Sequence, residues 1–238
     1  MNLDVLIFTA HPDDAEISIG GTIAKFTDNG YKVGIVDLTQ GELGTRGTKA
    51  TRKKEATEAS KILNISYRTN LKIPDGKVKF SDKYLNNMIT EIRKTKPKII
   101  FAPYFNDRHP DHIGAGLLAK EAYFFSGLPK IKTNFNGKSQ EAYRPYKLFY
   151  FMMTYEFTPT FINDISNYIE IKMQSILAYK TQFYDPKSEE PETFISQPGF
   201  LKAIEAKARY FGFKINKEYG EPFYCEESLD IDFKSLLK

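Results

Sequence analysis

Cysteine, histidine and tryptophan are scarce in this chain of 238 residues, which contains one cysteine, three histidines and no tryptophan. A single cysteine excludes an internal disulfide and is typical of a reducing compartment, so we expect a cytoplasmic protein. No histidine lies near Cys225 in the sequence, which argues against a thiol nucleophile. The three histidines are therefore the stronger candidates for chemistry.

Long apolar runs are also absent, since no segment approaches the roughly 18 consecutive apolar residues that cross a bilayer. The first apolar segment contains Asp4 and follows no basic region, a pattern that predicts a strand rather than a signal peptide. The net charge of +4 is small and the lysines are dispersed, so we expect neither nucleic acid nor a membrane as a partner. A weakly positive chain favours an anionic small-molecule substrate.

Apolar segments rich in β-branched residues alternate with segments of helical periodicity along the chain. The predicted strands are 3–9, 32–39, 66–71, 98–102, 147–153 and 161–165. The predicted helices are 17–29, 51–63, 81–95, 113–125, 167–183 and 200–211, the second capped by Thr51 and the third by Ser81. This order predicts an α/β fold with a Rossmann-like, doubly wound, mainly parallel sheet flanked by helices, in one domain of residues 1–238. We expect residues 221–224 to cover one end of the sheet.

Two segments rich in histidine and aspartate follow the first and fourth predicted strands. They are Ala10–Glu16 (AHPDDAE) and Arg108–His112 (RHPDH), and together they hold all three histidines. In open α/β sheets, ligands bind at the carboxyl ends of the strands. Proline and aspartate also suit a plain helix start, but helix capping does not readily explain two such segments with a histidine before each proline. We therefore expect the two segments to meet over one metal site.

Catalytic zinc sites use three protein ligands and leave one position for water, whereas closed structural sites usually draw on cysteines. His11 and His112 are candidate nitrogen ligands, and either Asp13 or Asp14 would complete the set. The second aspartate could then deprotonate the attacking water. His109 is left over and could stabilise an oxyanion.

A glycine-rich segment, Gly41–Thr48 (GELGTRGT), follows the second predicted strand. Its three glycines predict a loop with unusual backbone angles, but the pattern matches neither a dinucleotide-binding fingerprint nor a Walker loop. Nucleotide binding is therefore not favoured. Arg46 and Arg108 lie in loops of the predicted site and could pair with Glu42 or Asp107 to set the loop shape.

The histidine segments, together with Gly20–Thr22, resemble the PIG-L/LmbE family of metal-dependent N-deacetylases. The segment Gly41–Thr48, followed by Arg52 and Glu55, resembles more narrowly the branch that deacetylates N-acetylglucosaminyl-malate in bacillithiol biosynthesis. Residues 182–183 and 199–209 fit the same branch, so the resemblance covers most of the chain.

The resemblance implies a Rossmann-like fold that holds zinc, or Fe²⁺ in cells. It implies that His11, Asp14 and His112 are the metal ligands and that Asp13 is the general base and then the general acid. It also implies that His109 assists at the tetrahedral intermediate. The partner would be a small-molecule amino sugar, and the aromatic content together with the resemblance suggests a homo-oligomer, with a hexamer among its forms.

The substrate-binding residues follow from the same resemblance and from the predicted loops. Arg52 would hold the sugar hydroxyls or the malate. Glu42, Arg46 and Asp107 lie in the predicted site loops, and Arg144 is a further candidate.

We expect a hydrolase that removes the acetyl group from an N-acetylglucosaminyl conjugate, most simply N-acetylglucosaminyl-malate. One alternative is another N-acetylglucosamine conjugate or a chitooligosaccharide. A second alternative, from a different class, is a sugar-binding protein with a non-catalytic metal. The presence of Asp13 beside Asp14 argues against a mere binder, which needs no base.

Overall fold

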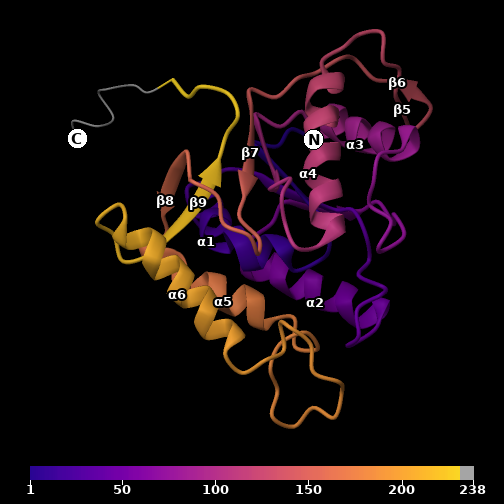
Figure 1. The fold of residues 1–238 in the computed structure, drawn as a ribbon. Coiled ribbons are helices and arrows are strands. Elements are labelled where there is room, and N and C mark those ends of the chain that lie inside the picture. The colour runs from indigo at the N-terminus through magenta and orange to yellow at the C-terminus, as the bar shows by residue number, and fades with distance from the viewer. Residues whose placement is uncertain (231–238) are drawn as a thin grey trace.

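The computed structural model describes residues 1–230, and a seven-stranded sheet in the order β3-β2-β1-β4-β7-β9-β8 lies at its centre (Figure 1). The strands of this sheet are β1 (Val5–Thr9), β2 (Val33–Asp37), β3 (Tyr67–Asn70), β4 (Ile99–Pro103), β7 (Lys147–Phe151), β8 (Phe161–Asp164) and β9 (Gly220–Tyr224). A separate small hairpin consists of β5 (Asn134–Phe135) and β6 (Lys138–Ser139).

Strands β3, β2, β1, β4 and β7 pair in parallel, and β9 pairs antiparallel with both β7 and β8. The chain runs outward from β1 through β2 to β3 and then returns to the other side of β1 as β4. The neighbouring ends of β1 and β4 therefore form the switch point at which α/β sheets bind ligands. The mainly parallel, Rossmann-like fold predicted from the sequence is confirmed.

Helices cover both faces of the sheet, with α3 and α4 together on one side and α1 and α5 on the other (Figure 1). The bounds are α1 (Asp14–Asp28), α2 (Lys49–Ile62), α3 (Asp82–Thr95), α4 (Pro110–Ser126), α5 (Ile169–Leu177) and α6 (Phe200–Phe213), with a short 3₁₀ helix at Ser166–Tyr168. Alternate residues of β1 point to opposite faces: Leu6 and Phe8 pack under α3 and α4, whereas Val5 and Ile7 pack under α1. Among the described residues, no helix has both the length and the apolarity to cross a membrane.

Helix α1 contains a break at Ile19, whose φ of −133° and ψ of 22° are not helical. The break releases the backbone N–H groups of Gly21 and Thr22, which donate to the Glu221 carboxylate of β9 at 3.0 and 2.7 Å. Gly21 allows this approach, because a Cβ there would lie 2.7 Å from Ile165 Cδ1. A strand near the end of the chain thus anchors the helix that begins at the first histidine segment.

The region predicted to cover one end of the sheet, residues 221–224, forms strand β9 inside the sheet instead. Pro222 lies within this strand, opposite Ile162 of β8. Proline is normally confined to edge strands because it lacks an N–H donor, which is why the sequence did not suggest a strand between two others.

The second helix begins earlier than predicted. Thr48, not Thr51, is its N-cap: Thr48 Oγ1 accepts from the Thr51 N–H at 3.1 Å, and Thr51 Oγ1 accepts from the Thr48 N–H at 2.7 Å. This reciprocal capping satisfies two backbone donors at the helix start, and it places Arg52 in the first turn.

Candidate metal centre and active site

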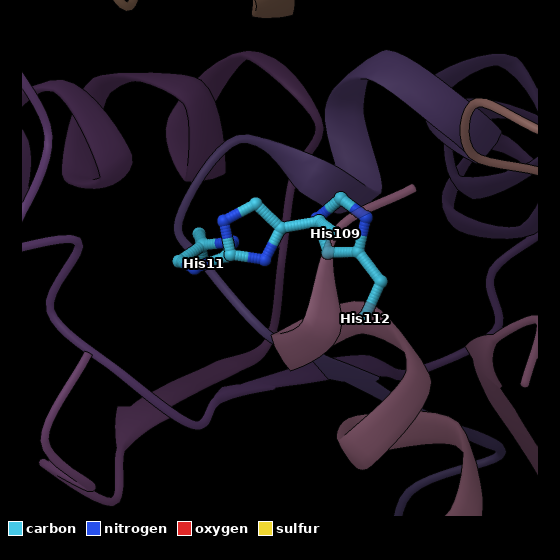
Figure 2. A group of neighbouring side chains, drawn as sticks. All are labelled: His11, His109 and His112. Carbon is cyan, nitrogen blue, oxygen red and sulfur yellow. The ribbon is translucent and has the colours of Figure 1, made fainter. Parts of the chain in front are cut away.

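The two histidine segments meet because β1 and β4 are neighbouring parallel strands that end at the same edge of the sheet. His11 lies in the loop after β1, and His109 is the N-cap of α4, one turn before His112. The ring centroids of the three histidines are 4.8 to 5.4 Å apart, with the imidazoles gathered in one place (Figure 2).

His11 and His112 each contact one carboxylate through one ring nitrogen and face Asp14 through the other. His11 contacts Asp75 through Nε2 at 3.0 Å and faces Asp14 Oδ2 through Nδ1 at 3.7 Å. His112 contacts Asp107 Oδ2 through Nδ1 at 2.5 Å and faces Asp14 Oδ1 through Nε2 at 3.4 Å. A metal-bound histidine almost always donates its other ring N–H to a carboxylate or a carbonyl, so this donor set fits a metal ion.

The electrostatics of this position favour a positive charge. Burial lowers the pKa of His112, but the carboxylates of Asp14 and Asp107 outweigh burial and raise that pKa to about 9. Burial likewise raises the pKa of Asp14, but His112 and His11 hold that pKa well below its usual range. These pKa directions favour a positive charge between the side chains, either protons on the imidazoles or a metal ion in their place.

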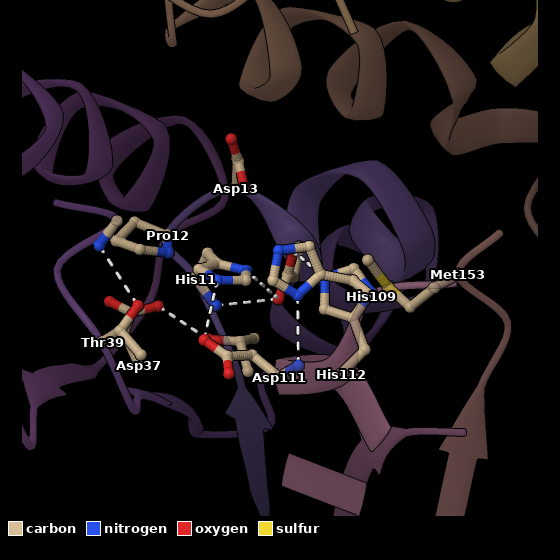
Figure 3. A network of polar contacts seen from close by, with 12 residues as sticks. His11, Pro12, Asp13, Asp37, Thr39, His109, Asp111, His112 and Met153 are labelled. Atoms are coloured by element: carbon tan, nitrogen blue, oxygen red, sulfur yellow. Dashed lines mark hydrogen bonds and ion pairs between the residues drawn. The ribbon is translucent and has the colours of Figure 1, made fainter. Parts of the chain in front are cut away.

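His109 faces the same space but is bonded differently. Its Nδ1 accepts the backbone N–H of Asp111 at 3.1 Å (Figure 3), and burial together with His11 and His112 lowers its pKa. The neutral imidazole must then carry its proton on Nε2. His109 is thus a hydrogen-bond donor toward the site rather than a ready metal ligand.

Among the described residues, potential ligand atoms lie within 4.8 Å of one another in two groups, His11 with His109 and His112, and His11 with Asp75 and Asp111. The tautomer of His109 argues against the first group. In the second, both oxygens of Asp111 already accept backbone N–H groups, from Gly76 at 2.7 Å and from Val78 at 3.1 Å. Asp14 belongs to neither group, and its Oδ2 also accepts a backbone N–H, from His11 at 2.9 Å. His11, Asp14 and His112 therefore stay the predicted ligand set, with Asp14 oxygens 3.7 Å from His11 Nδ1 and 3.4 Å from His112 Nε2.

Asp13 is the N-cap of α1 and has a φ of 107°, which is rare for a residue other than glycine. Burial raises its pKa to about 7, although the nearby guanidinium of Arg52 acts in the opposite direction. A carboxyl group with a pKa near neutrality suits proton transfer at physiological pH. Backbone strain of this kind concentrates at functional sites.

Arg52 reaches Asp13 from the first turn of α2. Its Nη1 donates to Pro12 O at 2.9 Å and to Asp13 Oδ2 at 3.1 Å. The glycine loop passes over the guanidinium, since a Cβ on Gly41 would lie 3.3 Å from Nη1 and one on Gly44 would lie 3.4 Å from Nη2. The glycine-rich segment therefore makes room for this arginine.

Glu42 and Arg46, two of the predicted substrate-binding residues, form contacts that shape loops. Glu42 accepts the backbone N–H of Asp75 at 3.1 Å. Buried Arg46 donates to Phe183 O at 3.2 Å and to the Ser188 hydroxyl, and its Nε lies 3.5 Å from Glu190 Oε2. Arg46 therefore secures the segment after α5 and is not paired with Glu42.

The structure does not bring Arg144, a predicted substrate-binding residue, to the histidines. Its guanidinium stacks 4.7 Å from the ring centroid of Phe124 and donates to Phe124 O at 2.7 Å, at the C-terminal end of α4. The site lies at the N-terminal end of this helix of 17 residues, about 25 Å away at 1.5 Å per residue.

Asp75 is a site residue that the sequence did not reveal. Besides contacting His11, it accepts the Leu43 N–H at 2.9 Å; burial raises its pKa, but these two contacts outweigh burial and lower it. Its only sequence signal is an acidic residue in a Pro-Asp-Gly turn, which many turns contain. Asp107 was predicted near the substrate but lies behind His112, where it also accepts the N–H groups of Thr154 and Tyr155 at 2.9 and 3.1 Å.

A cleft of about 560 Å³ opens over the site, within the usual range for small-molecule pockets. Arg108 stacks on Phe194, with its guanidinium carbon 4.3 Å from the ring centroid, and both line the cleft. The cleft is also lined by Asp13, Asp14, the three histidines, Arg52, Asp75, Met153, Thr154, Phe200, Ile204 and Lys207.

Comparison with known proteins places the same motifs in a family. Residues 6–123 match the family described as PIG-L, GlcNAc-PI de-N-acetylase. The chain is 32% identical to diacetylchitobiose deacetylase of Thermococcus kodakarensis, over 91% of this chain and 80% of that protein. It is 28% identical to a probable N-acetyl-alpha-D-glucosaminyl L-malate deacetylase 2 of Bacillus anthracis, over 75% of this chain and 81% of that protein.

The fold is also similar to that of the conserved protein TT1542 from Thermus thermophilus. The TM-score is 0.87 at 35% identity, covering 97% of both chains. The chain belongs to the PIG-L family of N-deacetylases and is an enzyme of that family.

Proposed function

We propose that this enzyme is a zinc-dependent deacetylase of an N-acetylglucosaminyl conjugate and that N-acetylglucosaminyl-malate, in bacillithiol biosynthesis, is its substrate. The observation that carries the proposal is the convergence of His11, Asp14 and His112, with Asp75 and Asp107 holding the outer nitrogens of the two imidazoles. Fe²⁺ fits the same donors and is the alternative metal in cells.

His11, Asp14 and His112 would hold the zinc ion, which would supply polarisation of the amide carbonyl and a water molecule acidic enough to attack near neutral pH. Arg52 holds one oxygen of Asp13, and the other oxygen is available for a proton. In our proposal Asp13 takes the proton as the water oxygen bonds to the acetyl carbon. It then delivers the proton to the nitrogen as the C–N bond breaks, which yields acetate and the free amino sugar.

His109 has a separate role in this proposal. Because its Nδ1 accepts a backbone N–H, its Nε2–H is directed as a donor into the site. That donor would stabilise the negative oxygen that develops on the acetyl carbonyl.

Two observations bear on the substrate. The Bacillus anthracis relative carries a name that specifies the malate conjugate, and the cleft of this chain contains Arg108, stacked on Phe194. The Thermococcus relative is named for diacetylchitobiose, so a chitooligosaccharide is the second candidate. Because the chain is an enzyme of a deacetylase family, the alternative of a non-catalytic sugar-binding protein is not retained.

The test is metal analysis of the purified protein, followed by a free-amine assay on N-acetylglucosaminyl-malate and on diacetylchitobiose at equal concentrations. We expect one bound zinc per chain and a higher kcat/KM for the malate conjugate. A preference for diacetylchitobiose would support the second candidate. Binding of metal and sugar without release of amine from either compound would indicate that another N-acetylglucosamine conjugate is the substrate.

We also propose that the protein is a homo-oligomer, with a hexamer as the form that the family resemblance suggests. Large apolar side chains such as Tyr146 and Phe213 are 76% and 80% exposed, as residues at a subunit interface are before assembly. Light scattering of the purified protein tests this proposal, and a monomer at micromolar concentration would contradict it.

A further inference from the structure

Lys207 of α6 lines the catalytic cleft but takes no part in the chemistry described above. Its ammonium donates to Met153 O at 2.8 Å and to Met152 O at 3.4 Å, both just after the end of β7. Those acceptors are neutral, and within residues 1–230 no carboxylate lies at ion-pair distance from Lys207. The lining of the cleft that contains Lys207 also includes the apolar side chains of Ile17, Phe200 and Ile204.

Two of the three acidic side chains near Lys207 already have partners, and the third, Glu156, is exposed and forms no ion pair with Lys207. Glu221 lies beside Lys207 in a small adjoining cavity, but its Oε1 is 2.6 Å from Lys172 Nζ and its two oxygens accept backbone N–H groups of α1. Asp107 is bonded to His112. Burial and the charge of Lys172 lower the pKa of Lys207 to about 8, with Glu156, Asp107 and Glu221 opposing that effect only in part.

A second cation of the cleft, Arg108, also has no carboxylate paired with it among the described residues. Arg108 stacks on the face of Phe194, and no ion pair to Arg108 occurs in the part of the chain that the structure describes. The cleft carboxylates are directed elsewhere, Asp13 to Arg52 and Asp14 to the histidines. Arg108 is exposed, whereas Lys207 is half-buried. A half-buried cation without an acidic partner is costly, and a ligand that brings the missing negative charge removes that cost.

We propose that Lys207, with Arg108, forms an anion subsite that binds the carboxylates of the group attached to the amino sugar. This inference rests on the proposed function, and it names the feature that would distinguish an acidic conjugate from a neutral chitooligosaccharide. Two cations match a substituent with two carboxylates, as in malate. An uncharged second sugar offers no group that would compensate either cation.

A purely structural role for Lys207 makes a different prediction. Through the carbonyls of Met152 and Met153, Lys207 braces the segment whose next N–H groups, at Thr154 and Tyr155, hold Asp107. Asp107 in turn holds His112. If bracing were its function, loss of Lys207 would weaken metal binding and would slow hydrolysis of every substrate equally.

The experiment compares kcat/KM for N-acetylglucosaminyl-malate and for diacetylchitobiose in the zinc-loaded wild type, Lys207→Gln, Lys207→Arg and Lys202→Gln. Lys202 lies exposed on the same helix and provides the matched control. We expect Lys207→Gln to lower kcat/KM for the malate conjugate about 10- to 100-fold, mainly through KM, because a hydrogen bond between charged groups is lost. The loss on diacetylchitobiose should be much smaller, Lys207→Arg should recover part of the activity, and Lys202→Gln should match wild type.

An equal loss on both substrates, or a fall in zinc content, would overturn the anion subsite and establish bracing. Binding of L-malate alone, measured by calorimetry on the same zinc-loaded proteins, separates this inference from the proposed function. A protein that deacetylates neither compound, yet binds L-malate at least about 10 times more weakly after Lys207→Gln, keeps the subsite while the enzymatic proposal fails. Equal affinity of wild type and Lys207→Gln for L-malate contradicts the subsite whatever the activity.

Discussion

At the scale of single residues, the orientation of His11 and His112 depends on the carboxylates of Asp75 and Asp107 as well as on Asp14. We expect His11→Ala and His112→Ala to lose bound metal and activity together, since each removes one of three proposed ligands.

Asp107→Asn should keep the fold and lower metal affinity about 10- to 100-fold, because it weakens the orientation of His112. Metal content by mass spectrometry checks all three variants. Full occupancy in either alanine variant would disprove the ligand assignment.

Asp13 differs from Asp14 in its environment, although the two are adjacent in the sequence. Asp14 faces both imidazoles, whereas Asp13 is buried against a single guanidinium. Asp13→Asn should therefore retain the metal and reduce kcat about 10²- to 10⁴-fold, the usual contribution of a general acid–base. Steady-state kinetics with parallel metal analysis is the measurement, and loss of metal would mean that the roles of the two aspartates are exchanged.

Arg52 was expected to bind the substrate, and the structure gives its guanidinium a different partner. Because Nη1 contacts Asp13 and Pro12, removal of Arg52 should disturb the base itself. We expect Arg52→Ala to lower kcat about 10- to 100-fold on the malate conjugate and on diacetylchitobiose alike, with partial recovery in Arg52→Lys, since a hydrogen bond between charged groups is lost. A loss confined to the malate conjugate would return Arg52 to the role of substrate ligand.

At the scale of secondary structure, the position of α1 depends on β9. Glu221 satisfies two N–H groups at the break in α1 and neutralises buried Lys172. Glu221→Ala should lower the free energy of unfolding by about 3–5 kcal/mol, because a buried cation loses its partner. Urea denaturation measures the change, and exposed Glu218→Ala is the control. The prediction fails if the two variants are equally stable.

At the scale of the whole molecule, the proposed metal site lies between two loops and outside the hydrophobic core. The apolar clusters on both faces of the sheet contain none of the proposed ligands. Removal of metal with a chelator should therefore lower the melting temperature, since the native state loses a tightly bound ligand, and should leave one cooperative transition. Calorimetry with and without zinc checks this, with His112→Ala as the insensitive control. A chelated protein that unfolds without cooperativity would show that the metal is required for folding.

The alternation of strands and helices could be predicted because it depends on residues that are neighbours in the sequence. Apolar runs of β-branched residues and amphipathic periods are local, and so is the placement of each histidine motif directly after a strand. Once the strands form a parallel sheet, the motifs after β1 and β4 must lie at the same edge. The meeting of His11 with His112 was therefore accessible from local pattern and the general geometry of α/β sheets.

Only the tertiary structure determines which partner each charged group has. Asp75 comes from a turn 64 residues after His11, and Glu221 lies 200 residues after Gly21 in the helix that it anchors. Nothing near Arg52 in the sequence indicates that it reaches Asp13. Nothing near Arg144 indicates that it lies beyond the far end of α4, away from the histidines. Charge pairs form wherever the packing of the sheet and helices brings side chains within hydrogen-bond distance. That distance depends on the whole path of the chain, whereas a strand or a helix depends on a few consecutive residues.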